Sequence, residues 1–190
     1  LLAEHIENCP ADDAFAAGLA LENGLIHLMK ESSTAIRWSK ETRFKAGAER
    51  IEHERELFGM NHMDAFVKLG RAWLLPENLL YVVATHHDLE RAHPPGAKDL
   101  CAVVRHSDEL AQCFVSANTT TALEEWVQRV AEEMGCAPSS LWEVANQTLE
   151  LVGKTGKVLG VEVDGDITLD ILCSEDRTVD PASMTREELV

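Results

Sequence analysis

Two adjacent histidines and an aspartate, His86, His87 and Asp88, follow the apolar run 79–84 after a single threonine. Imidazole nitrogens and carboxylate oxygens bind transition metals, and a metal-bound water can act as the nucleophile in a hydrolysis reaction. These three residues therefore raise the hypothesis of a metal centre. A helix turns by about 100° per residue, so two adjacent helical residues cannot both aim at one ion unless the helix unwinds. We expect one histidine to serve the core and the other to lie at its margin.

A carboxylate also falls on an apolar face. When residues 9–31 are projected as one helix, Glu22 shares a side with four apolar residues, Phe15, Leu19, Ile26 and Met29. Burying a carboxylate is costly unless another group pairs with it. The sequence therefore predicts a partner for Glu22 in the interior.

Two further polar residues lie on or beside apolar helical stripes. His62 shares a face with three residues, Phe66, Leu69 and Trp73, while Asp64, Lys68 and Arg71 share the opposite one. Asp108 lies at the margin of a face formed by Leu100, Val103, Val104 and Ala111.

These helices would direct a set of polar groups toward one interior: Glu22, His62, His86 or His87, and Asp108. A single histidine on an apolar face is more often a hydrogen-bonded core residue than a metal ligand. The combination of several such groups predicts a polar cluster, but a cluster does not by itself require a metal.

Helix signals position these residues along most of the chain. A charged helix over about 40–58 is expected to end at Gly59, and Asn61 can cap a helix that runs to Leu75. Pro76 is tolerated in the first turn of the next helix, and another helix covers about 98–115. Two more helices are predicted from capping boxes, Thr121 with Glu124 and Ser140 with Glu143. The predicted fold class is all-α, a helical bundle with extra C-terminal helices and a short irregular or hairpin tail.

The composition excludes several classes of partner. The formal net charge is −16, from 33 acidic and 17 basic residues, so nucleic acid and anionic membranes are not expected partners. No apolar run approaches the roughly 20 residues that span a bilayer, and no signal-peptide pattern is present. The five cysteines are scattered without CxxC spacing, which is typical of reduced thiols and indicates a cytoplasmic protein.

Three segments are expected. Residues 1–117 form the helical core, residues 118–156 a helical pair packed on it, and residues 157–190 an acidic tail with a short hairpin and then a linker. The sequence does not begin with Met, and its first residues have the pattern of a helix that has already started. We therefore interpret the chain as a fragment whose earlier residues are missing.

Several of these motifs occur in an order typical of one family. "AFAAGLALENGLIHL" is followed by Glu54, "FG" and His62, then by "WLLP" ending at Pro76, and then by "ATHH". Over about residues 1–115 the chain resembles the HDOD domain, the HD-related output domain of bacterial signalling proteins. That resemblance implies a helical bundle derived from HD-superfamily metal phosphohydrolases, which has lost hydrolysis and kept a role in signal transduction.

The resemblance also assigns positions. The His-Asp pair that names the superfamily falls on Leu21 and Glu22, and leucine has no lone pair for a metal. His62 and His86 match positions where metal-binding relatives use histidine, and Asp108 matches the late aspartate. We favour Glu–His hydrogen bonds without an ion, and expect no catalytic residue and no cofactor. A metal, if bound, would take Glu22, His62, His86 and Asp108 as ligands.

The first functional hypothesis is a non-catalytic regulatory module that binds other signalling proteins or neighbouring domains, with a homodimer as a further option. Trp126 and Trp142, on two amphipathic helices, are the residues expected at an interface. The alternative is a metal-dependent phosphohydrolase acting on a nucleotide or cyclic dinucleotide. Few basic residues could hold its phosphate, since Lys30, Arg71 and Arg105 are the nearest in the chain and Arg71 projects away. A small-ligand sensor that uses the remaining cavity is a third option.

Overall fold

The computed structural model describes residues 1–6, 9–30, 36–38, 41, 47–88, 94, 97–116, 118–160 and 169. Within these ranges the secondary structure is helical, and the all-α fold class is confirmed. The chain divides into two compact units, Leu1–Asp108 and Glu109–Val190, and each is described here by itself. The predicted division at 117 and 156 concerns domains rather than such units, and stays a prediction.

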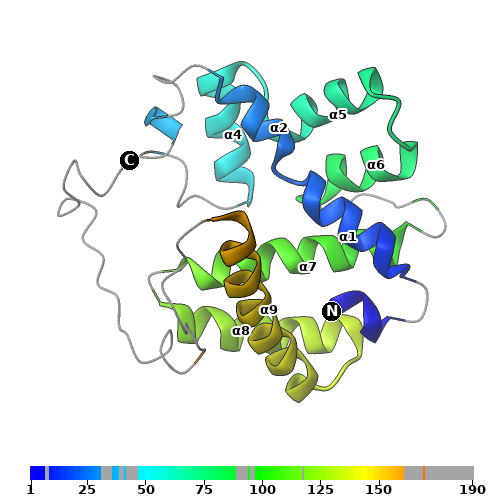
Figure 1. Ribbon diagram of the computed structural model, residues 1–190, viewed down its shortest axis with the longest axis vertical. Helices are drawn as coiled ribbons and strands as arrows, with labels where there is room; N and C mark the ends of the chain where they lie inside the picture. Colours follow the sequence, from blue (N-terminus) through cyan, green and yellow to red (C-terminus); the bar gives the residue numbers. More distant parts are fainter. Residues whose placement is uncertain are drawn as a thin grey trace. The chain divides into compact units, whose positions relative to one another are not determined.

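The first unit begins with a short 3-10 helix, η1 (Leu2–His5), and continues through α1 (Ala11–Ala20) and α2 (Asn23–Leu28). After α4 (Gly47–Phe58) come α5 (His62–Ala72) and α6 (Glu77–Thr85). Figure 1 shows α5 and α6 side by side, with α2 against α5 and α1 against α6. The unit is therefore built around the α5–α6 pair.

Local chemistry fixes the end of α4 and the starts of α5 and α6 as expected, whereas α5 ends at Ala72 rather than at the predicted Leu75. Gly59 follows α4 with a φ of +76°, a backbone conformation that glycine adopts without steric cost. Asn61 caps α5, because its Oδ1 accepts a hydrogen bond from the Asp64 N–H at 2.8 Å. Pro76 is the N-cap of α6. His62 consequently becomes the first residue of α5, in a position that a cap holds in place.

The prediction of one helix over residues 9–31 is wrong. The chain breaks at Leu21 and Glu22, which separate α1 from α2. The apolar residues that suggested a continuous stripe are exposed: Phe15 at 68%, Leu19 at 65% and Ile26 at 69%. The buried side is formed instead by smaller or neighbouring residues, namely Ala17, Ala20, Leu21 and Leu25.

Gly24 accounts for the side that α2 buries. A Cβ atom placed there would lie 1.8 Å from the carbonyl oxygen of His62 and 2.9 Å from the backbone nitrogen of Phe66. The backbones of α2 and α5 therefore approach more closely than any side chain would allow. This contact turns the Gly24 side of α2 inward, and Ile26 outward.

Two other face assignments need correction. Trp73 was placed on the buried face of α5, but α5 ends at Ala72 and Trp73 is exposed in the following turn. There the chain turns through Leu74, which has a φ of +57° and is exposed. Ala111, assigned to the buried face of the helix that holds Asp108, is exposed as well. His62, Phe66, Val103 and Val104 are buried as predicted.

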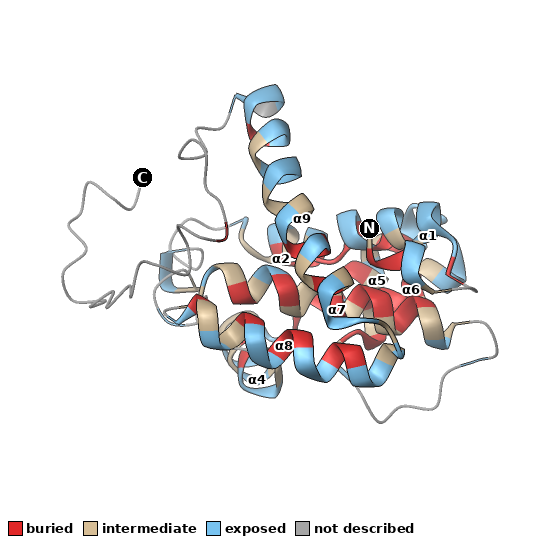
Figure 2. Cartoon of the chain, turned by 90° about the horizontal axis from the view of Figure 1, so that it is seen from below, coloured by how far each residue is buried: buried red, intermediate tan, exposed pale blue. Residues whose placement is uncertain are grey.

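The helix α7 (Lys98–Phe114) contributes residues to both units. The second unit contains α8 (Thr119–Met134) and α9 (Pro138–Leu159), which pack against each other. In Figure 2 buried and exposed residues alternate along α8, as expected of an amphipathic helix.

The two predicted capping boxes do not start these helices. Asn118 caps α8, because its side chain accepts from the Thr121 N–H, and Pro138 opens α9 at the first helical position. Both helices therefore begin two residues before the predicted cap. In addition, α9 continues to Leu159, so that the first residues of the predicted tail are helical. The predicted hairpin falls largely outside the described residues.

Trp126 is buried in the core and so is not exposed for an interface. Trp142 is half-buried, and its role at an interface stays a prediction. Among the described helices, none combines the length and the apolar character that crossing a membrane requires.

Candidate metal centre

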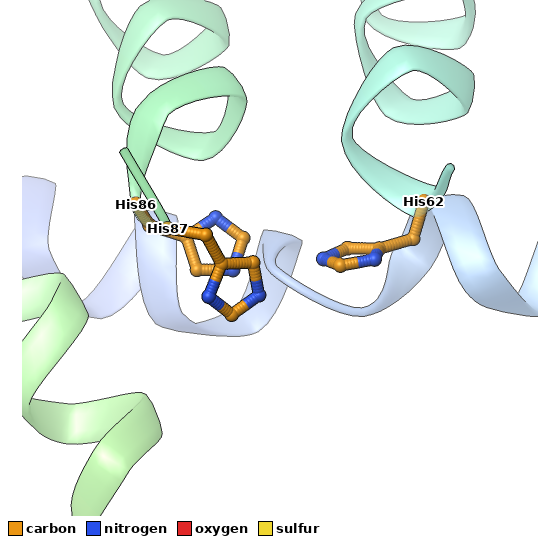
Figure 3. Close-up of side chains that lie close together, drawn as sticks. All are labelled: His62, His86 and His87. Carbon is orange, nitrogen blue, oxygen red and sulfur yellow. The ribbon is translucent and has the colours of Figure 1, made fainter. Parts of the chain in front are cut away.

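Three histidines converge in the first unit. His62 begins α5, and His86 and His87 follow α6; Figure 3 shows the three rings facing a common space. One ring nitrogen from each lies within 4.8 Å of the other two. The ring centroids of His62 are 5.4 Å from those of both other histidines, and the rings of His86 and His87 are 3.9 Å apart. His62 and His86 are fully buried, and His87 is half-buried.

The end of α6 makes this convergence possible. The last residue of the helix is Thr85, and His86 is its C-cap. A turn follows, closed by a hydrogen bond from the Asp88 N–H to the Thr85 carbonyl oxygen at 2.8 Å. Both histidines thus lie past the helix, where the rotation of about 100° per residue no longer separates neighbours. The burial agrees with the expectation of one histidine in the core and the other at its margin, since His86 is fully buried and His87 half-buried, and the end of the helix lets both rings lie near His62.

Hydrogen bonding decides which nitrogen of His86 is available. Nδ1 lies 2.8 Å from the carbonyl oxygen of Val83, and a carbonyl can only accept, so Nδ1 carries the proton and donates it. Burial lowers the pKa of His86 from 6.5 to about 4, which keeps the ring neutral near pH 7. The remaining nitrogen, Nε2, then has a free lone pair, and it is buried without a hydrogen-bond partner.

Glu54 sets the orientation of His62 in the same way. Burial alone would raise the pKa of Glu54, but the hydrogen bonds and charge of His62, together with Arg50, lower it to about 2. An ionised carboxylate only accepts, so His62 donates to Oε2 from Nδ1 at 2.6 Å and from its backbone N–H at 2.9 Å. Nε2 of His62 is likewise buried and without a partner.

His87 completes the group. Its Nε2 is a third buried atom without a hydrogen-bond partner. Burial, followed by the charge of His86, lowers the pKa of His87 from 6.5 to about 3, so this ring too is neutral near pH 7. The predicted cluster does not satisfy all of its own polar atoms, since one nitrogen of each ring stays unpaired.

The partner of Glu22 is a cation rather than a histidine. Nη2 of Arg50 lies 2.8 Å from Oε1 and 2.6 Å from Oε2 of Glu22. Glu22 is the N-cap residue of α2, and its side chain is 43% exposed rather than aimed into the core. Nε of the same arginine donates to Oε1 of Glu54 at 3.0 Å. One guanidinium therefore joins the two carboxylates.

The sequence prediction identified part of this site. His62, His86 and His87 come together, but Glu22 and Asp108 are not in the group of closely spaced ligand atoms among the described residues. Asp108 is half-buried on α7 and has an interaction of its own. The sequence prediction did not include Arg50 and Glu54, because α4 has many charged residues and its pattern is typical of a solvent-exposed helix. Their spacing of four residues, which puts both on one helical face, was the available signal.

The atoms present fit a transition-metal ion. Three imidazoles have an Nε2 atom without a partner, and two of them donate their other N–H to a carboxylate or a backbone carbonyl, which is the arrangement found behind metal-bound histidines. A set of nitrogen ligands suits zinc, copper, nickel or iron rather than magnesium or calcium. His62, His86 and His87 are the residues that would hold the ion.

An all-helical domain with inward histidines at the ends of two packed helices is of the kind that the HD resemblance predicts. Residues 1–89 match the family model described as the HDOD domain, which confirms the resemblance for this part of the chain. A match to this domain suggests a signalling module related to the HD superfamily. No curated protein and no solved structure matches the chain.

Proposed function

We propose that this chain is a non-catalytic regulatory module that holds one transition-metal ion on His62, His86 and His87, and that acts through contacts with other signalling proteins or neighbouring domains. The observation that carries the proposal is a group of three histidines that each bring one ring nitrogen within 4.8 Å of the others, and whose Nε2 atoms are buried without hydrogen-bond partners. Unpaired buried polar atoms cost about 1–3 kcal/mol each, so a native core retains them where a ligand completes them.

The position of the ligands supports a regulatory role. His62 opens α5, while His86 and His87 follow α6, and Glu54 reaches His62 from α4. An ion bound to the three rings would tie these helix ends together and stabilise their packing. Its loss would loosen the same ends, and a partner that contacts them can respond to that difference.

The residues at the His-Asp positions support a non-catalytic module. Leu21 is buried and offers no ligand atom, and the carboxylate of Glu22 is held by Arg50. The competing hypothesis is phosphoester hydrolysis, because three protein ligands also leave a coordination position for water, which a bound ion would activate. We expect no turnover of a model phosphomonoester or a cyclic dinucleotide by the metal-loaded protein, and sustained turnover that stops when His86 is replaced would favour the hydrolase.

Metal analysis tests the centre directly. Protein stripped with a chelator, reloaded with Zn²⁺ and freed of excess metal should retain about one equivalent, while His62→Ala and His87→Ala should retain far less. His27→Ala is the matched control, since His27 is half-buried in α2 and outside the group. Zn²⁺ at about 100 times its Kd should also add about 2.7 kcal/mol to the free energy of unfolding.

A buried water molecule is the other occupant that could bridge the three Nε2 atoms. In that case the wild-type protein would retain no more zinc than His62→Ala, and Zn²⁺ would leave its unfolding unchanged. That pair of results would overturn the proposed metal centre.

A further inference from the structure

We propose that Arg50 determines which cation the centre selects, because it holds both nearby carboxylates and leaves a set of nitrogen ligands for a single ion. This inference rests on the proposed metal centre and assigns a specificity-determining role to a residue outside the ligand group. Without Arg50, the carboxylate of Glu22 would be free to bind a cation, and the site would accept harder, oxygen-preferring ions.

The geometry around Arg50 shows how completely this side chain is engaged. Nη2 binds both oxygens of Glu22, at 2.8 and 2.6 Å, and Nε binds Glu54 at 3.0 Å. The guanidinium carbon lies 5.6 Å from the ring centroid of Trp38, within the range of a cation–π contact. Arg50 itself is buried. A guanidinium fixed on three sides is a permanent, pre-oriented counter-ion.

The charges next to the histidines follow from these contacts. Two carboxylates and one guanidinium leave a net charge of −1 beside the ring cluster. Glu54, the second partner of Arg50, is bonded to Nδ1 of His62 at 2.6 Å, so one carboxylate connects the Glu22–Arg50 pair to a proposed ligand. Glu22 itself is not in the group of closely spaced ligand atoms.

A cation would consequently meet imidazole nitrogens, with each neighbouring carboxylate already bound to Arg50 or His62. Nitrogen ligands favour Zn²⁺, Ni²⁺ and Cu²⁺, whereas Mn²⁺ and Mg²⁺ need carboxylate oxygens. Arg50 thus acts against the hard cations by withholding Glu22.

The experiment compares Zn²⁺ and Mn²⁺ affinity in four full-length proteins by competition with a chromophoric chelator. Wild type should bind one Zn²⁺ and bind Mn²⁺ only weakly. Glu22→Gln should leave Zn²⁺ affinity within about 3-fold, since Glu22 is not a ligand. Arg50→Met should raise Mn²⁺ affinity by about 10-fold or more, and Glu22→Gln added to Arg50→Met should remove that gain.

Arg55→Met is the matched control, because Arg55 lies on the same helix, is exposed and pairs with Glu52, which is also exposed. Its Mn²⁺ affinity should equal that of wild type. Circular dichroism of each variant shows whether α4 and its neighbours are folded.

The possible outcomes distinguish a failure of this inference from a failure of the proposed metal centre on which it rests. If wild type binds no Zn²⁺, the metal centre itself fails. If wild type binds Zn²⁺ but Glu22→Gln loses about 10-fold in Zn²⁺ affinity, Glu22 is a ligand and the role assigned to Arg50 is wrong. A folded Arg50→Met protein without a gain in Mn²⁺ affinity contradicts it equally. If Arg50→Met does not fold, the Zn²⁺ affinity of Glu22→Gln decides alone.

Discussion

The imidazole of His62 and the carboxylate of Glu54 are joined by two hydrogen bonds to the same oxygen, 2.6 Å from the ring Nδ1 and 2.9 Å from the backbone N–H. Both residues are fully buried. The pair fixes the tautomer of His62, so that its Nε2 lone pair points into the space shared with His86 and His87. Glu54 therefore orients a ligand without belonging to the ligand set.

Replacing Glu54 by Gln should weaken metal binding while His62 remains present. The amide can donate as well as accept, so it no longer requires Nδ1 of His62 to carry the proton. Loss of such a supporting carboxylate lowers metal affinity by about 10–100-fold. Chelator competition with Zn²⁺ measures the effect, and Glu56→Gln, at an exposed position of the same helix, should change nothing. Equal affinity in the two variants would show that the Glu54 contact does not matter for binding.

The metal-free protein should lose stability as the pH falls from 6.5 toward about 4. In the unfolded chain a histidine takes up a proton below pH 6.5, whereas His86 in the fold stays neutral down to about 4. The unfolded state thus binds more protons in this window, and each such histidine removes about 1.4 kcal/mol per pH unit. His87, with a pKa of about 3, acts in the same direction.

Urea unfolding of chelator-treated protein across that window measures the slope. His86→Asn, whose amide can still donate to the Val83 carbonyl, should flatten it, and His27→Asn should leave it as in wild type. A slope that is identical in wild type and His86→Asn would mean that His86 does not stay neutral in the fold.

Adding one methyl group at Gly24 should destabilise the first unit severely. The new Cβ would meet the His62 carbonyl oxygen at 1.8 Å, and backbone cannot move aside as a flexible side chain can. We expect a loss of about 3 kcal/mol or more in the free energy of unfolding, with weaker metal binding because His62 must shift. Gly18→Ala in α1 is the control: its Cβ meets nothing within 4 Å, and it should stabilise by about 0.5–1 kcal/mol. Thermal denaturation measures the stability of both variants. A Gly24→Ala protein as stable as wild type would contradict the prediction.

The two asparagine caps should differ in strength. Asn61 is buried and accepts from the Asp64 N–H at 2.8 Å, whereas Asn118 is exposed and its bond from the Thr121 N–H is 3.4 Å long. Asn61→Ala should therefore cost about 1–2 kcal/mol and Asn118→Ala about 0.5 kcal/mol. Chemical denaturation followed by circular dichroism distinguishes them, and a larger loss for Asn118→Ala would contradict this ranking.

The fold class and three of the helix boundaries, at Gly59, Asn61 and Pro76, were predictable because they depend on short-range chemistry. Asn61, Pro76 and Gly59 affect the backbone within a few residues of themselves, so their effect can be predicted without the tertiary structure. The break at Leu21 and Glu22 was not, since Phe15, Leu19 and Ile26 have helical spacing but remain exposed. What orients α2 is a backbone contact between Gly24 and His62, 38 positions apart in the sequence.

The site was predictable in its histidines and not in its charges. His62 and His86 stand out as polar residues beside apolar ones, and both are buried. Arg50 and Glu54 stand among many charged residues of α4, and only the packed structure shows that this pair faces inward. Glu22 was assigned to the core from a periodicity that the chain does not follow through residues 21 and 22.

The stop of α6 at Thr85 has a consequence for how metal motifs are recognised. Helical ligand pairs are sought at separations of three or four residues, because those separations place two side chains on one face. His86 and His87 have a separation of one and would be passed over by such a search. A substitution that extended α6 by one turn would separate the two rings without altering either histidine. The proposed motif therefore depends on the position of the helix end as much as on the two imidazoles.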